Sequence, residues 1–412
     1  MNKTIIFSVL LLVVIIIAVI LVTQVNYKTL VLHTLKKIKY GTINIAIENG
    51  NILILGSEDP TLYKCEIFVK DEQMFFRELA LNGDIGLGET FVSGVWYTRR
   101  TDDLLLFLLI LSINMDDMNV KMKTNKTKQS GFVVDEQAIS HHYDVGNDFY
   151  FTFLLDSLKA YSCGFWLNKQ DTLQDAQYNK VHKIIDKLQA RPGQKILDIG
   201  CGWGHIASYV QKRTKANVYG ITLSHEQIKY IQENIRDIEV EYGHYTPKNK
   251  EIRFDKVYSI GMFEHVRCLN YVTFFRSVWE SLLDNGDLVL HTITTLRDDT
   301  RCSDGSTQNF LTKYIFPDGQ IPKIEWVVKA AEKVGFKLTL METFAGHHYA
   351  KTLVAWRNNM LTAGDHIKRL GYSDNILKTY EYYMNECAAA FYAGHMQVTQ
   401  FVFKKTENTL ML

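Results

Sequence analysis

The sequence predicts an α/β protein whose main domain is a mostly parallel sheet flanked by helices, preceded by a smaller α+β domain and one transmembrane helix. Three observations support this fold class. Beyond residue 131, runs typical of strands alternate with runs typical of helices. One of these strands passes through a glycine-rich turn directly into a helix. With 412 residues, the chain is also too long for one ordinary hydrophobic core.

Four strands are expected in the main domain. They cover Lys195–Ile199, Asn217–Ile221, Asp255–Ile260 and Asp287–Ile293. The sequence Ser224-His-Glu-Gln227 has the form of a capping box, which places a helix start directly after the second strand. Strands that alternate with helices in this way form a parallel sheet.

An apolar run near the N-terminus predicts a single-pass membrane anchor within residues 1–27. From Ile5 to Val22 only Ser8 is polar, and a helix of this length at ~1.5 Å per residue spans ~27 Å, close to the hydrocarbon thickness of a bilayer. A cleaved signal peptide is the alternative, but no small-x-small cleavage pattern follows the run. The lysines just after it predict that the main domain lies on the cytosolic side. They are Lys28, Lys36, Lys37 and Lys39.

The rest of the chain divides into two domains and a linker. A small N-terminal domain is expected over 40–117, with short β-like runs in 41–79 and a buried helix over Leu104–Leu111. The segment 118–130 is polar and lacks apolar periodicity, so it is expected to be a linker. The main domain then covers 131–412.

Charge and cysteine content narrow the classes of function. Lys and Arg number 46 against 45 Asp and Glu, so no overall field favours nucleic acid, and no nucleic-acid partner is expected. The cysteines lie far apart and form no C-x-x-C pair, so we expect neither a metal site nor a redox dithiol. They are Cys65, Cys163, Cys201, Cys268, Cys302 and Cys387. Six unpaired cysteines suit a reducing compartment.

The glycine-rich turn indicates a cofactor site. Lys195–Gly204 reads K-I-L-D-I-G-C-G-W-G, and glycines at such a turn let backbone N–H groups approach a ligand closely. The spacing does not match the dinucleotide pattern G-x-G-x-x-G. It resembles the turn of class I (Rossmann-like) S-adenosylmethionine-dependent methyltransferases. That resemblance implies that Asp198, Gly200, Gly202 and Gly204 line the cofactor.

Several further motifs occur in the order seen in cyclopropane-fatty-acyl-phospholipid synthases, which the chain resembles from about residue 40 to 405. They are H-Y-D-V-G-N-D-F-Y (142–150), Y-S-C-G-F-W (161–166), L-D-I-G-C-G-W-G (197–204), T-L-S-H-E-Q (222–227), G-M-F-E-H-V (261–266), L-H-T-I (290–293) and K-Y-I-F-P-D-G (313–319). In the N-terminal domain, G-D-I-G-L-G-E-T (83–90) and G-V-W-Y (94–97) also match. The resemblance implies that this domain binds lipid. It further implies transfer of a one-carbon unit to the double bond of an unsaturated phospholipid acyl chain, forming a cyclopropane.

The resemblance also implies which residues hold the cofactor. Besides the turn, these are Tyr161, Ser162, Thr222, Ser224, Gln227 and Ile260. The side chains at 222, 224 and 227 also fit a plain helix cap, so that alternative stays open. His244 stands where relatives usually have an Asp, and this departure puts one adenine contact in doubt.

The proposed chemistry needs a base in a dry site, because methyl transfer to an alkene creates a carbocation that water would capture. The resembling enzymes hold a bicarbonate as this base. Here the matching residues are Cys163, Glu264, His291 and Tyr349. Glu264 can accept the hydroxyl proton of the ion, while His291 and Tyr349 can donate to its other oxygens. Cys387 matches a further family cysteine, for which the mechanism needs no role.

Other readings stay open. Arg267 and Thr294 stand where glycine is common in the family, so a methyl- or methylene-branched product is an alternative to the cyclopropane. A small-amine N-methyltransferase shares some motifs, and a non-catalytic lipid-binding protein would need a broken site. Membrane and unsaturated phospholipid are the expected partners, and a homodimer is left open.

Overall fold

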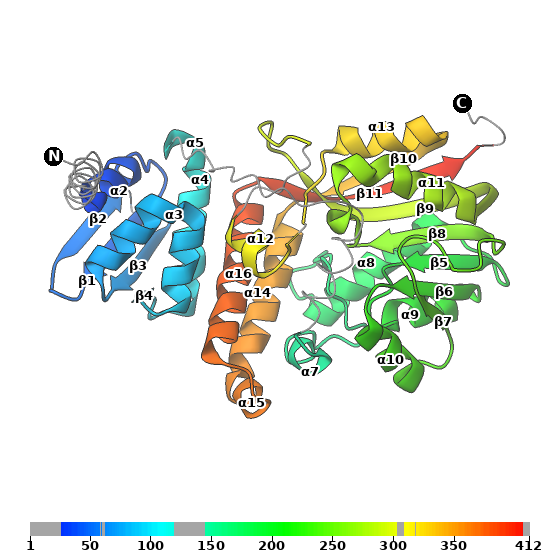
Figure 1. The fold of residues 1–412 in the computed structure, drawn as a ribbon, viewed down its shortest axis with the longest axis horizontal. Helices are drawn as coiled ribbons and strands as arrows, with labels where there is room; N and C mark the ends of the chain where they lie inside the picture. Colours follow the sequence, from blue (N-terminus) through cyan, green and yellow to red (C-terminus); the bar gives the residue numbers. More distant parts are fainter. Residues whose placement is uncertain are drawn as a thin grey trace, which may run out of the picture. The chain divides into compact units, whose positions relative to one another are not determined.

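The computed structural model describes residues 26–57, 59, 62–118, 145–302, 309–317 and 319–406. Its contacts divide the chain into two compact units (Figure 1), each considered by itself below. The first unit holds residues 1–103 and 114–120, and the second holds residues 104–113 and 121–412.

Two predicted segments fall mainly outside the described residues. These are the membrane anchor at 1–27 and the linker at 118–130. Among the residues that the structure does describe, no helix combines the length and apolar character that a membrane crossing requires.

The first unit contains a four-stranded sheet in the order β2-β1-β3-β4. Its strands are β1 (Thr42–Ile47), β2 (Ile52–Gly56), β3 (Lys64–Val69) and β4 (Trp96–Tyr97), and its helices are α2 (Tyr27–Leu35), α3 (Glu72–Val92) and α5 (Met115–Met118). β1 pairs antiparallel with β2 and parallel with β3, so this unit is α+β as expected. The β-like character expected over 41–79 ends at β3, because the Asp71 side chain accepts a hydrogen bond from Met74 N (2.9 Å) and starts helix α3.

The second unit is built on a seven-stranded sheet in the order β10-β11-β9-β8-β5-β6-β7. Its strands are β5 (Lys195–Ile199), β6 (Asn217–Thr222), β7 (Glu239–Tyr242), β8 (Phe254–Ile260), β9 (Leu282–Thr295), β10 (Phe336–Phe344) and β11 (Met396–Lys405). The pairs from β9 to β7 are parallel, and β11 runs antiparallel to both β9 and β10. The four strands expected from the sequence are confirmed, and β9 extends beyond the predicted range at both ends.

The second unit also contains helices and two 3-10 turns. The helices are α7 (Asn147–Tyr150), α8 (Leu173–Leu188), α9 (His205–Thr214), α10 (His225–Asn234), α11 (Tyr271–Ser281), α12 (Phe310–Tyr314), α13 (Ile324–Val334), α14 (His347–Thr362), α15 (Gly364–Arg369) and α16 (Asp374–Tyr392), and the turns are η1 (Phe263–His265) and η2 (Cys268–Asn270). Helix α4 (Thr101–Ile113) is divided, with residues 101–103 in the first unit and residues 104–113 in the second. One buried cluster joins the sheet to α11 and α13, and another joins it to α8 and α9. An aromatic-rich cluster joins α7, α14 and α16.

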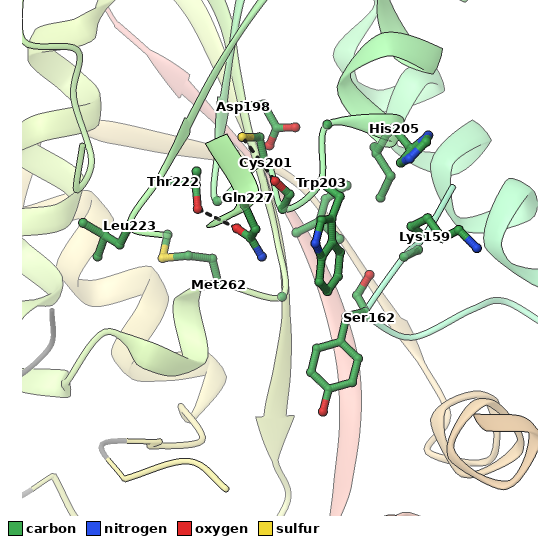
Figure 2. A pocket seen from close by; sticks show the side chains of 18 of the residues that line it. Lys159, Ser162, Asp198, Cys201, Trp203, His205, Thr222, Leu223, Gln227 and Met262 are labelled. Atoms are coloured by element: carbon green, nitrogen blue, oxygen red, sulfur yellow. Dashed lines mark hydrogen bonds between the residues drawn. The ribbon is translucent and has the colours of Figure 1, made fainter. Parts of the chain in front are cut away.

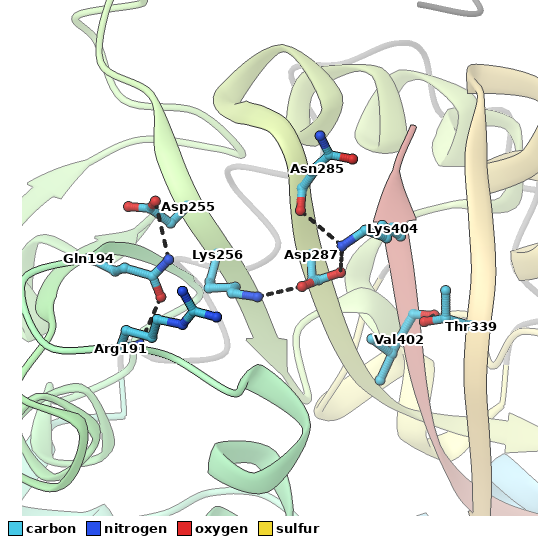
Figure 3. A network of polar contacts seen from close by, with 9 residues as sticks. All are labelled: Arg191, Gln194, Asp255, Lys256, Asn285, Asp287, Thr339, Val402 and Lys404. Atoms are coloured by element: carbon cyan, nitrogen blue, oxygen red, sulfur yellow. Dashed lines mark hydrogen bonds and ion pairs between the residues drawn. The ribbon is translucent and has the colours of Figure 1, made fainter. Parts of the chain in front are cut away.

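A charged network links the parallel part of the sheet to its antiparallel part (Figure 3). Asp287 on β9 pairs with Lys256 on β8 and, at 3.4 Å, with Lys404 on β11. These residues lie opposite one another in the strand registers. Cross-strand pairs of opposite charge stabilise a sheet, so the network helps to fix the register of β9, the strand that carries His291.

The expectation of six unpaired cysteines is wrong. Cys268 in η2 and Cys302 form a disulfide, with their Cα atoms 5.8 Å apart, and the remaining four cysteines are free. The sequence gives no sign of this pair because the two cysteines lie 34 positions apart, with β9 between them. Only the folded chain brings the two ends of that segment together.

Candidate active site

A pocket lies at the carboxyl ends of β5, β6 and β8 (Figure 2). The strand order places β5 between β6 and β8, and ligands of open α/β sheets bind where the order reverses in this way. Every predicted cofactor residue except Ser224 lines this pocket. Those residues are Tyr161, Ser162, Asp198, Gly200, Gly202, Gly204, Thr222, Gln227 and Ile260.

The glycine turn is shaped by positive φ angles and close packing. Gly200 has a φ of 83°, and a Cβ there would lie 2.8 Å from the Cβ of Met262. Gly202 has a φ of 55°, and a Cβ there would meet nothing within 4 Å. Since Gly202 also lines the pocket, a side chain at this position would enter the space left for a ligand.

Asp198 provides a buried carboxylate at the base of the pocket. Its side chain is only 3% exposed, and Oδ2 accepts a hydrogen bond from Tyr258 Oη (2.7 Å). Burial raises the pKa of Asp198 to about 7, although the Tyr258 hydrogen bond and the charge of Lys180 act in the opposite direction. A positively charged ligand group would offset this burial and favour the ionised carboxylate.

The segment that carries Tyr161 and Ser162 forms another wall of the pocket. Tyr161 Oη lies 2.9 Å from Tyr383 Oη on α16. Ser162 is buried; its carbonyl accepts from Gln177 Nε2 (2.9 Å), and its Oγ accepts from Lys180 Nζ (2.8 Å). Both groups of Ser162 are therefore positioned by helix α8.

The T-L-S-H-E-Q motif divides into two roles. Thr222 Oγ1 donates to Gln227 Oε1 (2.7 Å), and both residues line the pocket (Figure 2). Ser224 Oγ accepts from Gln227 N (3.3 Å) and caps α10. The structure thus gives Ser224 the capping role that the sequence had left open. His244, the departure from the family pattern, lines the pocket after β7.

Glu264 is a buried acid with one free oxygen. It lies in η1, between the pocket residues Met262 and His265, and Oε1 accepts a hydrogen bond from Ile293 N (2.7 Å). Oε2 is buried and has no partner within the described part of the chain. Burial raises the pKa of Glu264 to about 7. Such an unsatisfied oxygen is costly in a protein interior and is typical of a functional site.

His291 lies two residues before Ile293 on β9 and is held as a neutral ring. It is 2% exposed, and burial lowers its pKa well below the usual value. Gln400 Nε2 lies 3.1 Å from His291 Nδ1 and donates to it, which leaves the proton of the neutral ring on Nε2. His291 is therefore prepared as a hydrogen-bond donor.

Cys163 and Tyr349 reach the same region through Phe165. The Phe165 ring stacks on His291 with centroids 5.8 Å apart, and it shares a buried cluster with Cys163, against which Tyr349 packs. Burial raises the pKa of the Cys163 thiol, so it is not prepared as a thiolate nucleophile. Of the four predicted base-site residues, Glu264 and His291 thus lie at β9, and Cys163 and Tyr349 lie in the cluster of Phe165. None of the four is among the residues that line the pocket.

Cys387 lies on α16 and is not a member of the Cys163 cluster. It is half-buried and packs against the aromatic-rich cluster of α14 and α16. Cys387 is not among the residues that line the pocket.

Sequence reasoning missed several residues that support the site. They are Gln177, Lys180, Trp203, Tyr258, Met262 and Gln400. The signal that pointed to Lys180 is its place on the buried stripe of α8, beside Val181 and Ile184. A lysine on the apolar face of a helix is rarely there for packing alone. Within the described residues, no group of three His, Cys, Asp or Glu side chains is arranged to hold a metal.

Together the strand order, the glycine turn and the pocket define a class I S-adenosylmethionine-dependent methyltransferase. Comparisons with known proteins narrow this class. The family model described as mycolic acid cyclopropane synthetase matches residues 132–401. The chain belongs to this cyclopropane synthase family.

Three relatives illustrate the match. The cyclopropane-fatty-acyl-phospholipid synthase of Escherichia coli (strain K12) is 33% identical over 384 residues, which cover 90% of this chain and 95% of that protein. The cyclopropane synthase MmaA2 of Mycobacterium tuberculosis is 32% identical, and its structure aligns over 68% of this chain and 100% of its own with a TM-score of 0.59. The mycolic acid cyclopropane synthase CmaA1, solved with SAH and CTAB, is 30% identical with the same coverages and TM-score.

Proposed function

We propose that this chain transfers a one-carbon unit from S-adenosylmethionine to the double bond of an unsaturated phospholipid acyl chain and closes a cyclopropane ring. The observation that carries this proposal is the buried Glu264: its Oε1 accepts from Ile293 N on β9, its Oε2 has no partner within the described residues, and the pocket residues Met262 and His265 flank it in the sequence. The Escherichia coli relative, matched over nearly its whole length, supports a phospholipid as the acyl carrier.

The pocket fits a cationic cofactor. S-adenosylmethionine, when bound, supplies the electrophilic methyl group. Asp198 offers the buried negative charge that attracts an ammonium group, and the open space at Gly202 lets the backbone approach a ligand. Thr222, Gln227 and Ile260 line the rest of the pocket. These contacts hold the cofactor and keep water out of the reacting region.

The base site fits a bicarbonate ion. Glu264 Oε2 is an unpartnered buried acceptor for the hydroxyl proton of such an ion, and the Nε2 proton of His291 is a donor for one of its other oxygens. When bound, the ion supplies the base that removes a proton from the transferred methyl group. Stripping dissolved carbonate should lower turnover, and restoring bicarbonate should recover it. An enzyme indifferent to carbonate would use another base.

A methyl- or methylene-branched product shares the same carbocation, and only the fate of that cation differs. Small-amine N-methylation is a more distant alternative, because the similarity to the synthase extends through the N-terminal domain. Incubation with methyl-labelled cofactor and unsaturated phospholipid vesicles separates these readings. Label in the released fatty acids supports the proposal, whereas label confined to the head group favours an amine substrate.

We also propose that residues 1–27 anchor the protein in the membrane, that the N-terminal domain binds lipid, and that the catalytic domain faces the cytosol. The Cys268–Cys302 disulfide removes the cysteine argument for a reducing compartment, so the orientation rests on the lysines after the apolar run. An anchor would raise the local concentration of acyl chains at the active site.

Protease added outside sealed vesicles with their cytosolic side inward should leave the catalytic domain intact. Digestion would contradict the topology. The mass of the purified protein in detergent shows whether the chain forms a homodimer.

A further inference from the structure

Helix α8 holds the segment 160–165, whose first three residues line the cofactor pocket. Phe165 N donates to Ala176 O (2.7 Å), and Asn179 Nδ2 donates to Phe165 O (3.0 Å). Gln177 Nε2 donates to Ser162 O (2.9 Å). These three contacts bind the backbone of the segment, so the position of Ser162 depends on α8.

Lys180 makes a fourth contact, which differs from the others because it reaches a side chain in the pocket wall. It lies one turn after Gln177, is 0% exposed, and its Nζ donates to Ser162 Oγ (2.8 Å). Lys180 does not line the pocket itself. Burial lowers the pKa of Lys180 to about 8, although the carboxylates of Asp156 and Asp198 act in the opposite direction and favour its charged form.

The contact with Lys180 determines what Ser162 can offer a ligand. A hydroxyl group has one proton to donate and two lone pairs, and an ammonium group can only donate. Because Ser162 Oγ accepts from Lys180 Nζ, its own proton is left for another partner. Since Ser162 lines the pocket, that partner can be a hydrogen-bond acceptor on the cofactor.

We propose that Lys180 is a positioning residue for the reaction: it fixes the Ser162 hydroxyl as a donor toward a negatively charged or carbonyl oxygen of the cofactor. This inference rests on the assignment of the pocket to S-adenosylmethionine. It assigns Lys180 no contact with the reacting atoms. Its effect passes through Ser162 and is therefore an effect on cofactor affinity.

The test is a double-mutant cycle on the full chain, with S-adenosylhomocysteine affinity measured by calorimetry. Lys180→Met and Ser162→Ala should each weaken binding by about tenfold to a hundredfold, the usual range for a hydrogen bond to a charged group. The double variant should bind no more weakly than Ser162→Ala alone, because the two residues act in series. In steady-state assays, the KM for S-adenosylmethionine should rise by a similar factor, whereas kcat at saturating cofactor should change much less.

Lys183→Met is the matched control, because Lys183 lies one turn further along α8 and pairs with Glu342 instead. It should leave affinity unchanged. If Lys180→Met binds normally while Gly202→Val loses binding, the role of Lys180 is wrong and the pocket assignment stands. If Gly202→Val also binds normally, the assignment itself fails. If Lys180→Met does not fold, Ser162→Ala still decides, since unchanged affinity in that variant contradicts the inference.

Discussion

Replacing Glu264 by Gln should abolish most turnover and yet make the protein more stable at alkaline pH. The substitution keeps the size of the side chain and an oxygen that can accept from Ile293 N. It removes the negative charge and replaces the acceptor at Oε2, which is buried and has no partner in the described structure. Turnover should fall because the proton acceptor is lost. Stability should rise because the folded chain no longer buries an ionised carboxylate.

The magnitude follows from the pKa of Glu264, which burial raises from 4.5 to about 7. Below the lower value both folded and unfolded chains carry the proton, so this group has no effect on stability. Between the two values only the unfolded chain ionises, and stability falls by about 1.4 kcal/mol per pH unit. The full loss is about 3 kcal/mol, reached above the folded pKa. The Glu264→Gln variant has no carboxyl group at this position, so its free energy of unfolding should not fall in this way.

The assay compares the free energies of unfolding of Glu264→Gln and the parent chain at about pH 4.5 and pH 8, by denaturant titration without cofactor. The difference should be small at the acidic pH and favour the variant by up to about 3 kcal/mol at pH 8. Glu332→Gln, at an exposed position on α13, should show no such change with pH. A Glu264→Gln variant that is no more stable at pH 8, or that turns over normally, would refute the reasoning.

Three further predictions concern the pocket and its surroundings. Burial raises the pKa of Asp198 to about 7, so cofactor affinity should weaken as the pH falls below this value and the carboxylate is protonated. Calorimetry at a series of pH values should show this weakening, and the Asp198→Asn variant should lack the pH dependence. Ser224→Ala should lower the free energy of unfolding by about 1 kcal/mol through loss of the α10 cap, while the KM for cofactor stays unchanged. Reducing the disulfide, or replacing Cys302 by Ser, should lower the free energy of unfolding by about 3–4 kcal/mol, as expected for a disulfide that closes a loop between positions 34 apart. Mass mapping of free thiols should find Cys268 and Cys302 paired in the unreduced chain.

The sequence predicted those parts of the fold that local patterns determine. The strands at 195–199 and 217–221 are short and consist mostly of apolar residues, and the first of them leads into a turn with three closely spaced glycines. The turn residues 200–204, Thr222 and Ile260 follow or end the strands β5, β6 and β8, and the carboxyl ends of parallel strands meet at one edge of the sheet, where these residues line the pocket.

Contacts between distant segments could not be predicted in this way. Lys180 meets Ser162 only because α8 packs along the 160–165 segment, and Gln400 meets His291 only because β11 pairs with β9. The Cys268–Cys302 disulfide has the same origin. Ser224 could not be assigned from local sequence either, because the same pattern fits a helix cap and a ligand contact. In the structure Ser224 caps α10 and does not line the pocket.

The most direct test of the account is the number of hydrogen atoms that the transferred carbon keeps. Purified protein is supplied with S-adenosylmethionine carrying a fully deuterated methyl group and with vesicles of monounsaturated phospholipid, and the released fatty acids are analysed by mass spectrometry. Ring closure by a base beside Glu264 removes one of the three deuterium atoms, so the product should be a saturated ring acid that retains two of them. A product that retains all three in a methyl branch, or lipid that remains unlabelled, would contradict the account.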